Sequence, residues 1–265
     1  MLERHLQKGL RVLVTAGAAG IGREIVRALV GDDARVHICD VDTAALEDAR
    51  REHGVTASVT DVADVEQVER LFADVRQHLG GLDVLVNNAG IAGPTARVES
   101  ITPADWRRTI DVNITGQFYC THFAVPLLRE SRRGVIVNMS SVAGRFGYPF
   151  RTPYAASKWA VVGFTQSLAR ELGADGITVN AILPGPVEGP RIERVIRARA
   201  ELLGVSYEEM ERRYRERASL QRMVSPRDVA AMVVFLCSEA GRNITGQSLS
   251  VCAGVDTLTV TGPSD

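Results

Sequence analysis

Lysine is almost absent from this sequence. Only Lys8 and Lys158 occur among its 31 basic side chains, and all the others are arginine. Lysine offers a compact ammonium on a mobile stem, whereas arginine offers a planar fork, so the two do not replace each other at a reactive site. Lys158 lies four residues after Tyr154 in the run Tyr-Ala-Ala-Ser-Lys. We therefore expect a specific role for the Lys158 ammonium.

Disulfide patterns, long apolar runs and excess charge are also absent. The four cysteines stand far apart with no Cys-x-x-Cys pair and no neighbouring histidine, so neither a disulfide framework nor a metal site is predicted. No apolar run reaches the roughly 18 residues of a membrane span, and the first five residues lack a signal-peptide pattern. A net charge of −1 gives no long-range attraction to nucleic acid or an anionic membrane. These absences predict a cytoplasmic protein that acts on a small molecule.

The chain does contain an alternation of strand and helix patterns. Its 265 residues fit one large α/β domain spanning 1–265, and no repeat or linker divides it. Short β-branched runs, apolar on both faces as buried parallel strands are, alternate with segments of helical spacing. The predicted strands are 11–14, 36–40, 57–61, 82–87, 135–139, 177–182 and 248–251. We therefore predict a doubly wound parallel sheet of about seven strands with helices on both faces, which binds ligands beyond the carboxyl ends of its strands.

The segment at about 190–219 departs from this alternation. From Arg191 to Arg217 it carries eight arginines and six glutamates, and it has no strand signal. We predict two helices joined at 204–206, where Ser206 followed by Glu209 is typical of a capping box. We expect this inserted helical pair to cover the active site as a substrate lid.

A loop of small residues, 15–22, follows the first predicted strand. It includes Ala16, Gly20, Ile21 and Gly22, at the point where the strand turns into an amphipathic helix. Unpaired amides and the helix dipole make such a turn an anion site. Tight strand-to-helix turns also need glycine for steric reasons alone, so this reading stays open.

Asp40 favours the phosphate-binding interpretation of that loop. It ends the second predicted strand about 20 residues beyond the loop, the spacing at which a carboxylate binds the adenosine ribose of a dinucleotide. A carboxylate there repels a 2′-phosphate, and no basic residue occurs in 15–22, so NAD is favoured over NADP. The alternative is a solvated aspartate in a turn, as Asp42 also offers.

Two further strand ends carry candidate cofactor contacts. Asp61 and Val62 follow the third predicted strand, and Asn88, Ala89 and Gly90 follow the fourth. Asp61 is expected to accept a hydrogen bond from the adenine amino group, and the small Ala89 and Gly90 to let the chain pass close to the cofactor. Turn chemistry explains the asparagine and glycine almost as well.

Tyr154 and Lys158 are expected on one face of a helix, because residues four apart are neighbours there. A cation about 4 Å from a phenol, at an effective dielectric constant near 20, lowers the phenol pKa from about 10 by up to about 3. Lys158 alone can therefore make Tyr154 a working base. Ser141 follows the fifth predicted strand, where its hydroxyl is placed to hold a substrate oxygen.

These motifs resemble the short-chain dehydrogenase/reductase family over nearly the whole chain. The matching features are the loop 15–22, the turn 87–90, Asn113, Ser141, Tyr154 with Lys158, and the turn Pro184-Gly185. The resemblance implies a Rossmann-like fold and an NAD-dependent oxidoreductase that interconverts a secondary alcohol and a ketone. It implies that Tyr154 is the acid/base and that Ser141 polarises the carbonyl. It also implies that Lys158 binds the nicotinamide ribose and that Asn113 anchors a proton-relay water.

The same resemblance implies cofactor contacts by Pro184, Gly185 and Val187, and a homotetramer. Helices at 102–128 and 153–172 would pack between subunits, and the tail after residue 246 would join a second interface. Two positions depart from the family pattern. Ala16 replaces a loop glycine, so we expect its backbone conformation to tolerate a Cβ. Gly189 stands where relatives often place a threonine that contacts the nicotinamide carboxamide, so an active enzyme with adjusted cofactor affinity is expected.

The substrate and two rival functions stay open. The arginines near the predicted site suggest an anionic substrate bound by Arg151 and Arg191, with Arg145 and Arg194 nearby, but we favour a solvated charged face offset by the glutamates of the insertion. A catalytically silent NAD-sensing protein would be expected to lack part of the tetrad. A carrier-linked 3-oxoacyl reductase usually needs NADPH, against which Asp40 argues.

Overall fold

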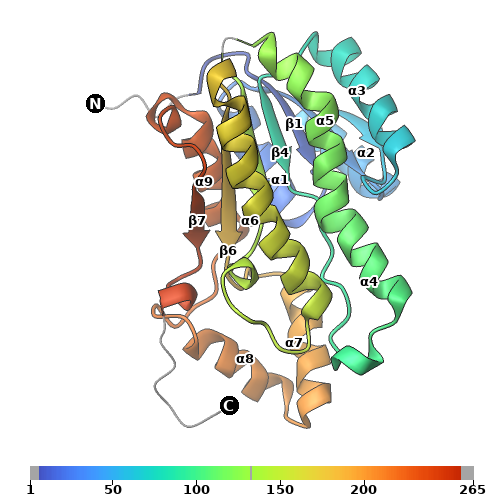
Figure 1. Ribbon diagram of the computed structural model, residues 1–265, viewed down its shortest axis with the longest axis vertical. Helices are drawn as coiled ribbons and strands as arrows, with labels where there is room; N and C mark the ends of the chain where they lie inside the picture. The colour runs from blue at the N-terminus through green and yellow to red at the C-terminus, as the bar shows by residue number, and fades with distance from the viewer. Residues whose placement is uncertain (1–5, 132, 258–265) are drawn as a thin grey trace.

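Seven parallel strands form one sheet in the computed structural model, which describes residues 6–131 and 133–257 (Figure 1). The strands are β1 (Arg11–Thr15), β2 (Arg35–Asp40), β3 (Thr56–Val59), β4 (Val84–Asn87), β5 (Val135–Met139), β6 (Thr178–Pro184) and β7 (Ser248–Val251). Their spatial order is β3-β2-β1-β4-β5-β6-β7, which confirms the predicted doubly wound sheet. The order reverses between β1 and β4, and ligands bind at such a switch point.

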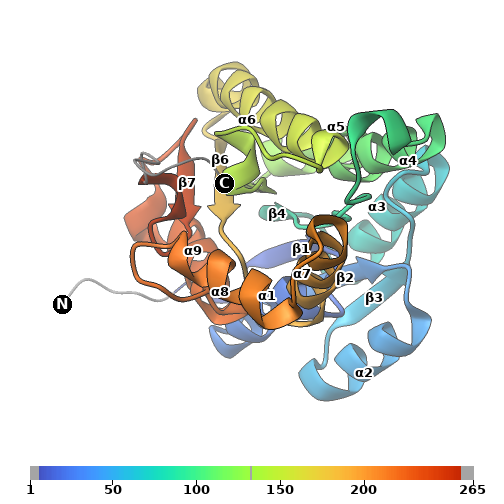
Figure 2. The same ribbon diagram turned by 90° about the horizontal axis from the view of Figure 1, so that it is seen from below.

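Helices cover both faces of this sheet (Figure 2). They are α1 (Gly20–Gly31), α2 (Thr43–His53), α3 (Val65–Leu79), α4 (Pro103–Ile110), α5 (Gly116–Arg129), α6 (Thr152–Leu172) and α9 (Pro226–Cys237). Side chains of α1, α2 and α9 share one core cluster, and those of α3, α5 and α6 share the other. The central strand supplies both clusters, because Val12 and Val14 point to the first and Leu13 to the second.

The third strand ends earlier than predicted, at Val59 instead of residue 61. β3 lies at the edge of the sheet with β2 as its neighbour, and the Val59 side chain is exposed. The main-chain amide of Asp61 donates to Oε1 of Gln67 at 2.9 Å, and its carboxylate accepts from the amide of Ala63 at 3.0 Å. These local bonds form a turn, so the strand pattern continues in the sequence past the point where the ladder stops.

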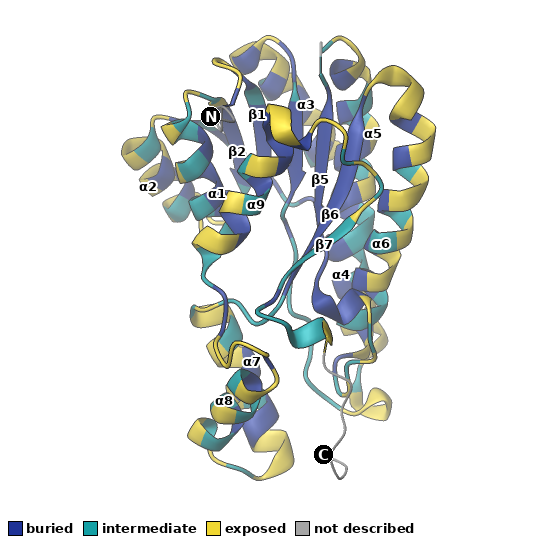
Figure 3. Ribbon diagram, turned by 90° about the vertical axis from the view of Figure 1, so that its left-hand side faces the viewer, coloured by how far each residue is buried: buried dark blue, intermediate teal, exposed yellow. Residues whose placement is uncertain are grey.

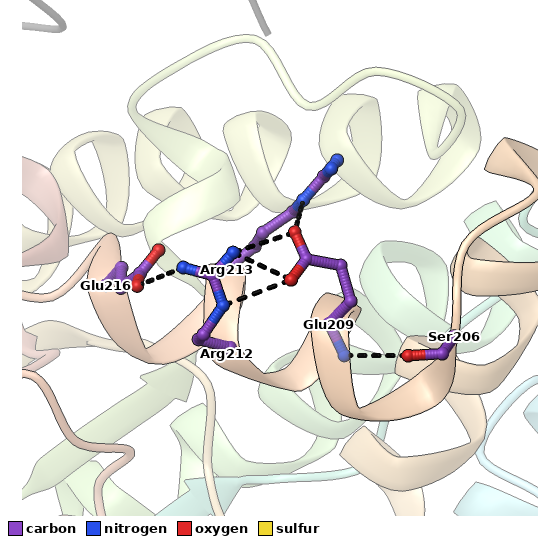
Figure 4. Close-up of polar contacts among 5 residues, drawn as sticks. All are labelled: Ser206, Glu209, Arg212, Arg213 and Glu216. Atoms are coloured by element: carbon purple, nitrogen blue, oxygen red, sulfur yellow. Dashed lines mark hydrogen bonds and ion pairs between the residues drawn. The ribbon is translucent and has the colours of Figure 1, made fainter.

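Two further helices, α7 (Pro190–Leu203) and α8 (Tyr207–Glu216), stand beyond the carboxyl ends of the strands (Figure 3). They are joined at 204–206, where Gly204 has φ +65° and the Ser206 hydroxyl accepts the amide of Glu209 at 3.1 Å. The Glu209 carboxylate binds Arg212 and Arg213 on the next turn (Figure 4). The pair has a small core of its own, formed by Ile196, Ala200, Met210 and Tyr214 with Met223 from the segment after α8.

Within residues 6–131 and 133–257, no helix is both long enough and apolar enough to cross a membrane. In the same part of the chain, no three histidine, cysteine, aspartate or glutamate side chains are grouped to hold a metal ion. The four cysteines are free and buried. Residues 1–5, on which the signal-peptide prediction depends, and residues 258–265 of the predicted second subunit interface lie outside the described residues.

Candidate active site

A cavity of about 630 Å³ opens at the carboxyl ends of the strands. It is bounded by the loops after β1, β2, β4, β5 and β6 and by helices α7 and α8. Asp40, Ser141, Tyr154 and Lys158 all line it. The structure therefore brings the predicted cofactor end and the predicted chemical end into one space.

Tyr154 and Lys158 occupy the first two turns of α6 and lie one turn apart. The Lys158 side chain is buried, and its Nζ donates to the main-chain carbonyl of Met139 at 2.8 Å. Nζ lies 5.7 Å from the centroid of the Tyr154 ring. The last residue of β5 thus holds the ammonium next to the phenol.

The electrostatics of this pair favour a reactive phenol. Burial by itself raises the pKa of Tyr154, but the charges of Lys158 and Arg191 and the hydrogen bond with Ser141 outweigh it, so the pKa lies below 10. Burial lowers the pKa of Lys158 to about 8, against the opposing effect of Tyr154. Burial therefore weakens the basicity of Lys158, while Lys158 in turn lowers the pKa of Tyr154.

Ser141 lies just after β5 in extended backbone, and it lines the cavity. Its hydroxyl accepts the amide of Ala143 at 3.2 Å, which starts the short turn Val142–Gly144. Gly144 in that turn packs against α6, because a Cβ on it would lie 2.6 Å from the Lys158 carbonyl oxygen. This close packing fixes the distance between the Ser141 loop and the helix that carries Tyr154.

Asn113 lies in a π-helical segment, η2 (Asp111–Thr115), that joins α4 directly to α5. Such wide turns often occur at functional sites. Oδ1 of Asn113 accepts the amide of Ile91 at 2.7 Å, and Nδ2 donates to the Ile91 carbonyl at 3.1 Å and to Oγ of Ser157 at 3.0 Å. Asn113 is fully buried and does not line the cavity. It connects the chain after Gly90 to helix α6.

The loop after β1 is held by the turn after β4. The Thr15 hydroxyl accepts the amides of Asn88 at 3.0 Å and Ala89 at 2.9 Å, and the Asn88 side chain donates to the carbonyls of Thr15 and Ala16 at 3.0 Å. The expectation for Ala16 is wrong, because its φ of +49° lies in the left-handed region that favours glycine. A Cβ on Gly22 would lie 2.0 Å from the Ala16 carbonyl oxygen, so only glycine fits there.

The two aspartates after β2 have different local roles. The Asp40 carboxylate accepts the amides of Val41 at 2.8 Å and Ala18 at 3.4 Å, so it is oriented beside the loop after β1. Asp42 caps helix α2 by accepting the amide of Ala45 at 3.0 Å. The solvated-turn alternative therefore suits Asp42 better than Asp40.

Not every predicted cofactor contact reaches the cavity. The predicted contacts that line the cavity include Gly20, Ile21, Asn88, Gly90, Pro184, Gly185 and Val187. Asp61, Val62 and Ala89 do not. Asp61 forms an ion pair with Arg108 at 2.9 Å. Val62 is buried against α5, since a Cβ on Gly116 would lie 2.8 Å from its Cγ2.

The arginines near the site do not form one solvated face. Arg145 is exposed and pairs with Asp256 at 2.8 Å. Arg191 and Arg194 are exposed but line the cavity. Arg151 also lines it and is only 4% exposed, so the predicted solvated face is wrong for this residue. The sequence spacing around Tyr154 does not reveal this burial, because it depends on other loops that cover the side chain.

Sequence reasoning missed a pair of tyrosines that links the lid to the site. The hydroxyls of Tyr148, before α6, and Tyr214, in α8, lie 2.8 Å apart, and both residues line the cavity. Arg199 of α7 is buried beside the same ring, with its guanidinium carbon 5.5 Å from the Tyr148 centroid. No local sequence pattern predicts these contacts, because the partners are far apart in the chain.

Comparisons with known proteins agree with this geometry. A family model described as Enoyl-(Acyl carrier protein) reductase matches residues 16–256. The chain is 39% identical over 250 residues to the granaticin polyketide synthase putative ketoacyl reductase 1 of Streptomyces violaceoruber, covering 92% of each protein. It is 32% identical over 251 residues to the 2-dehydro-3-deoxy-L-rhamnonate dehydrogenase (NAD(+)) of a Sphingomonas species, covering 94% of this chain and 96% of that one. A solved structure of a single-residue variant of actinorhodin polyketide ketoreductase with NADPH gives a TM-score of 0.90 at 36% identity, covering 94% of this chain and 98% of that one.

Proposed function

This chain belongs to the short-chain dehydrogenase/reductase family, and we propose that it uses NAD to interconvert a secondary alcohol and a ketone through Tyr154. It is an oxidoreductase of the kind that acts on CH–OH groups with a pyridine nucleotide. The observation that carries the proposal is that Tyr154, Lys158 and Ser141 line the same cavity as Asp40 and the loop after β1.

The loop after β1 fits a dinucleotide because side chains are missing where a phosphate would approach. Gly20 has φ +54° and open space around it, and α1 begins there with its unpaired amides. We propose that Gly20, Ile21 and Gly22 hold the pyrophosphate, that Asp40 holds the adenosine ribose, and that Lys158 holds the nicotinamide ribose. The cofactor contacts proposed for Asp61, Val62 and Ala89 require the bound cofactor to extend beyond the cavity.

Asp40 supports NAD over NADP. Its carboxylate accepts three main-chain amides, that of Ala18 in the loop after β1 and those of Val41 and Asp42, and a 2′-phosphate there would meet a like charge. Among the relatives, the rhamnonate enzyme is named for NAD(+), whereas the actinorhodin ketoreductase was solved with NADPH. The choice therefore depends on the charge at this position, which titration of the protein with NADH and NADPH measures directly.

The chemistry divides between hydride and proton transfer. The nicotinamide, when bound, supplies the hydride acceptor or donor. In oxidation, the Tyr154 phenolate accepts the proton of the substrate hydroxyl while Ser141 hydrogen-bonds the same oxygen, and Lys158 stabilises the phenolate. In reduction, the neutral phenol returns that proton to the carbonyl oxygen, so each turnover moves one hydride and one proton. Asn113 is proposed to anchor a water that carries the proton onward.

A carrier-linked 3-oxoacyl reductase is the second candidate. It is favoured by the 39% identity to a putative ketoacyl reductase of a polyketide synthase. Asp40 argues against it, because such reductases usually take NADPH. Turnover of 3-oxoacyl thioesters with NADPH, exceeding that of small ketones with NADH, would favour this second function.

We also propose a cytoplasmic homotetramer. Three exposed aromatic side chains lie on the helices predicted to pack between subunits: Trp106 on α4, Phe118 on α5 and Trp159 on α6. Covering such apolar surface stabilises an assembly. Four free, buried thiols support a reducing compartment. Sedimentation at dilute concentration tests the tetramer.

Replacing Tyr154 by phenylalanine tests the function. With NAD and a panel of secondary alcohols, absorbance of the reduced nicotinamide follows turnover. We expect Tyr154→Phe to lower kcat by at least about 100-fold, the usual contribution of a positioned acid/base, while NADH still binds. Undiminished oxidation by this variant would overturn the proposed mechanism.

A further inference from the structure

The positive charge around the cavity is not neutralised by the lid. Four arginines line the cavity and form no ion pair within the described part of the chain: Arg151, Arg191, Arg194 and Arg217. The arginines of α8, by contrast, are matched on their own helix, where Arg212 and Arg213 bind Glu209 (Figure 4). The glutamates of the insertion do not line the cavity. Three other carboxylates do, those of Glu188, Asp40 and Asp42, but within the described residues none of them forms an ion pair with these arginines.

Arg151 is the most constrained of these side chains. It precedes α6, and its Nη2 donates to the main-chain carbonyl of Ala92 at 2.7 Å. Its guanidinium carbon lies 4.7 Å from the centroid of the Tyr154 ring. Its Nε is buried and has no hydrogen-bond partner within the described residues. A buried cation without an ion-pair partner in the described part of the chain is unfavourable, and an anion supplied by a ligand would offset its charge.

A second cation lies close to the ring of Tyr154. Arg191 donates from Nη1 to the carbonyl of Gly90 at 3.0 Å, and its guanidinium carbon lies 6.0 Å from the Tyr154 centroid. Apolar side chains, including Val142, Phe146 and Ile192, also line this cavity. The site therefore combines a reactive phenol, two nearby guanidinium groups and apolar surface.

We propose that the substrate is a hydroxy acid, with the corresponding oxo acid as product, and that Arg151 binds its carboxylate with Arg191 beside it. This inference rests on the proposed alcohol and ketone chemistry and names its substrate class. A charge-assisted hydrogen bond from the Arg151 guanidinium to one carboxylate oxygen offsets the cost of burying that charge, and the site's low exposure strengthens it. The carbinol oxygen then lies at Tyr154 while the acid group is held by the cations.

Matched pairs of substrates test the inference. Secondary alcohols carrying a carboxylate at two, three or four carbons from the carbinol are compared with their primary amides, which have nearly the same shape and no charge. We expect the best acid to exceed its amide in kcat/KM by about 10- to 100-fold, the range for a hydrogen bond to a charged group. Arg151→Met should bring that ratio close to one.

The ratio of kcat/KM for the acid to kcat/KM for the amide distinguishes two effects of Arg151, binding of the substrate carboxylate and lowering of the Tyr154 pKa. The Arg151 charge also lowers the Tyr154 pKa, so Arg151→Met slows acid and amide alike, but only lost recognition changes their ratio. Arg145→Met is the control, because Arg145 is exposed and already paired with Asp256, and it should leave the ratio unchanged. A ratio near one in the unmodified protein, or a ratio that Arg151→Met leaves intact, overturns the inference.

One further measurement covers the case in which the variant does not fold. If Arg151→Met does not fold, short saturated carboxylates tested on the unmodified protein should inhibit amide turnover competitively with the amide and not with NAD, while saturated amides should not. Competition with NAD instead would assign the arginines to the cofactor pyrophosphate and overturn the inference. Equal turnover of acids and amides refutes the substrate class alone, whereas no turnover of any pair refutes the proposed function as well.

Discussion

Nζ of Lys158 donates to the main-chain carbonyl of Met139 at 2.8 Å, which ties the ammonium to the carboxyl end of β5. The same amine lies next to Gly90, since a Cβ on that glycine would lie 3.4 Å from Nζ. Nζ therefore lies between the carboxyl ends of β4 and β5, close to the main chain of both. This fit gives a physical reason for a lysine in a chain that otherwise uses arginine.

Lys158→Arg should inactivate the protein although the charge is kept. The planar guanidinium cannot occupy the space of one nitrogen between Met139 and Gly90, so we expect kcat to fall by at least about 100-fold. Lys8→Arg is the matched control, because Lys8 is exposed and lies outside the cavity. Circular dichroism verifies that both variants fold, and full activity of Lys158→Arg would contradict the role of a compact ammonium.

The pH profile of alcohol oxidation should follow the Tyr154 phenolate. The rate rises with pH up to the Tyr154 pKa, which lies below 10. Arg191→Met removes a positive charge that lowers this pKa, so the pKa rises and the ascending limb moves to higher pH. Profiles of kcat/KM with a neutral alcohol measure the shift. Arg197→Met, on an exposed arginine of α7 outside the cavity, should not move the limb.

Asp40→Asn should weaken discrimination against NADP. Removing the carboxylate charge removes the repulsion of a 2′-phosphate, so we expect the ratio of kcat/KM for NADP to that for NAD to rise at least about tenfold, equivalent to about 1.4 kcal/mol. Asp42→Asn is the control, since asparagine still caps α2. An unchanged ratio in Asp40→Asn would show that another residue selects the cofactor.

Tyr214→Phe should loosen the lid. Burial and the neighbouring Tyr214 raise the pKa of Tyr148 well above its usual value, so the Tyr148 hydroxyl keeps its proton. Losing one hydroxyl leaves the other without its partner, at a cost of about 1 to 3 kcal/mol of stability. Thermal unfolding measures this loss, and steady-state kinetics should show KM rising more than kcat changes. Tyr207→Phe in the same helix should alter neither quantity, and an unchanged KM in Tyr214→Phe would separate the pair from substrate binding.

Much of the fold and half of the site can be predicted from short patterns in the sequence. The strand and helix alternation determines the layers, because hydrophobic periodicity reflects which faces are buried. Tyr154 and Lys158 share a helix face because they are four residues apart. Asp40 and Ser141 reach the cavity because parallel strands end at the same edge of a sheet. Each of these predictions needs only neighbouring residues and the direction of the chain.

Other features were decided by contacts between distant segments. Arg151 is buried by the surrounding loops, Asp61 is held by Arg108, and Tyr148 meets a tyrosine of the lid. The left-handed φ of Ala16 follows from the way the turn after β4 holds its loop. A local pattern specifies which side chains are available on an element, but burial and pairing depend on what packs against that element. The sequence by itself therefore determined the catalytic pair and the layered sheet, and only the tertiary structure determined which arginines face the cavity without an ion pair to another described residue.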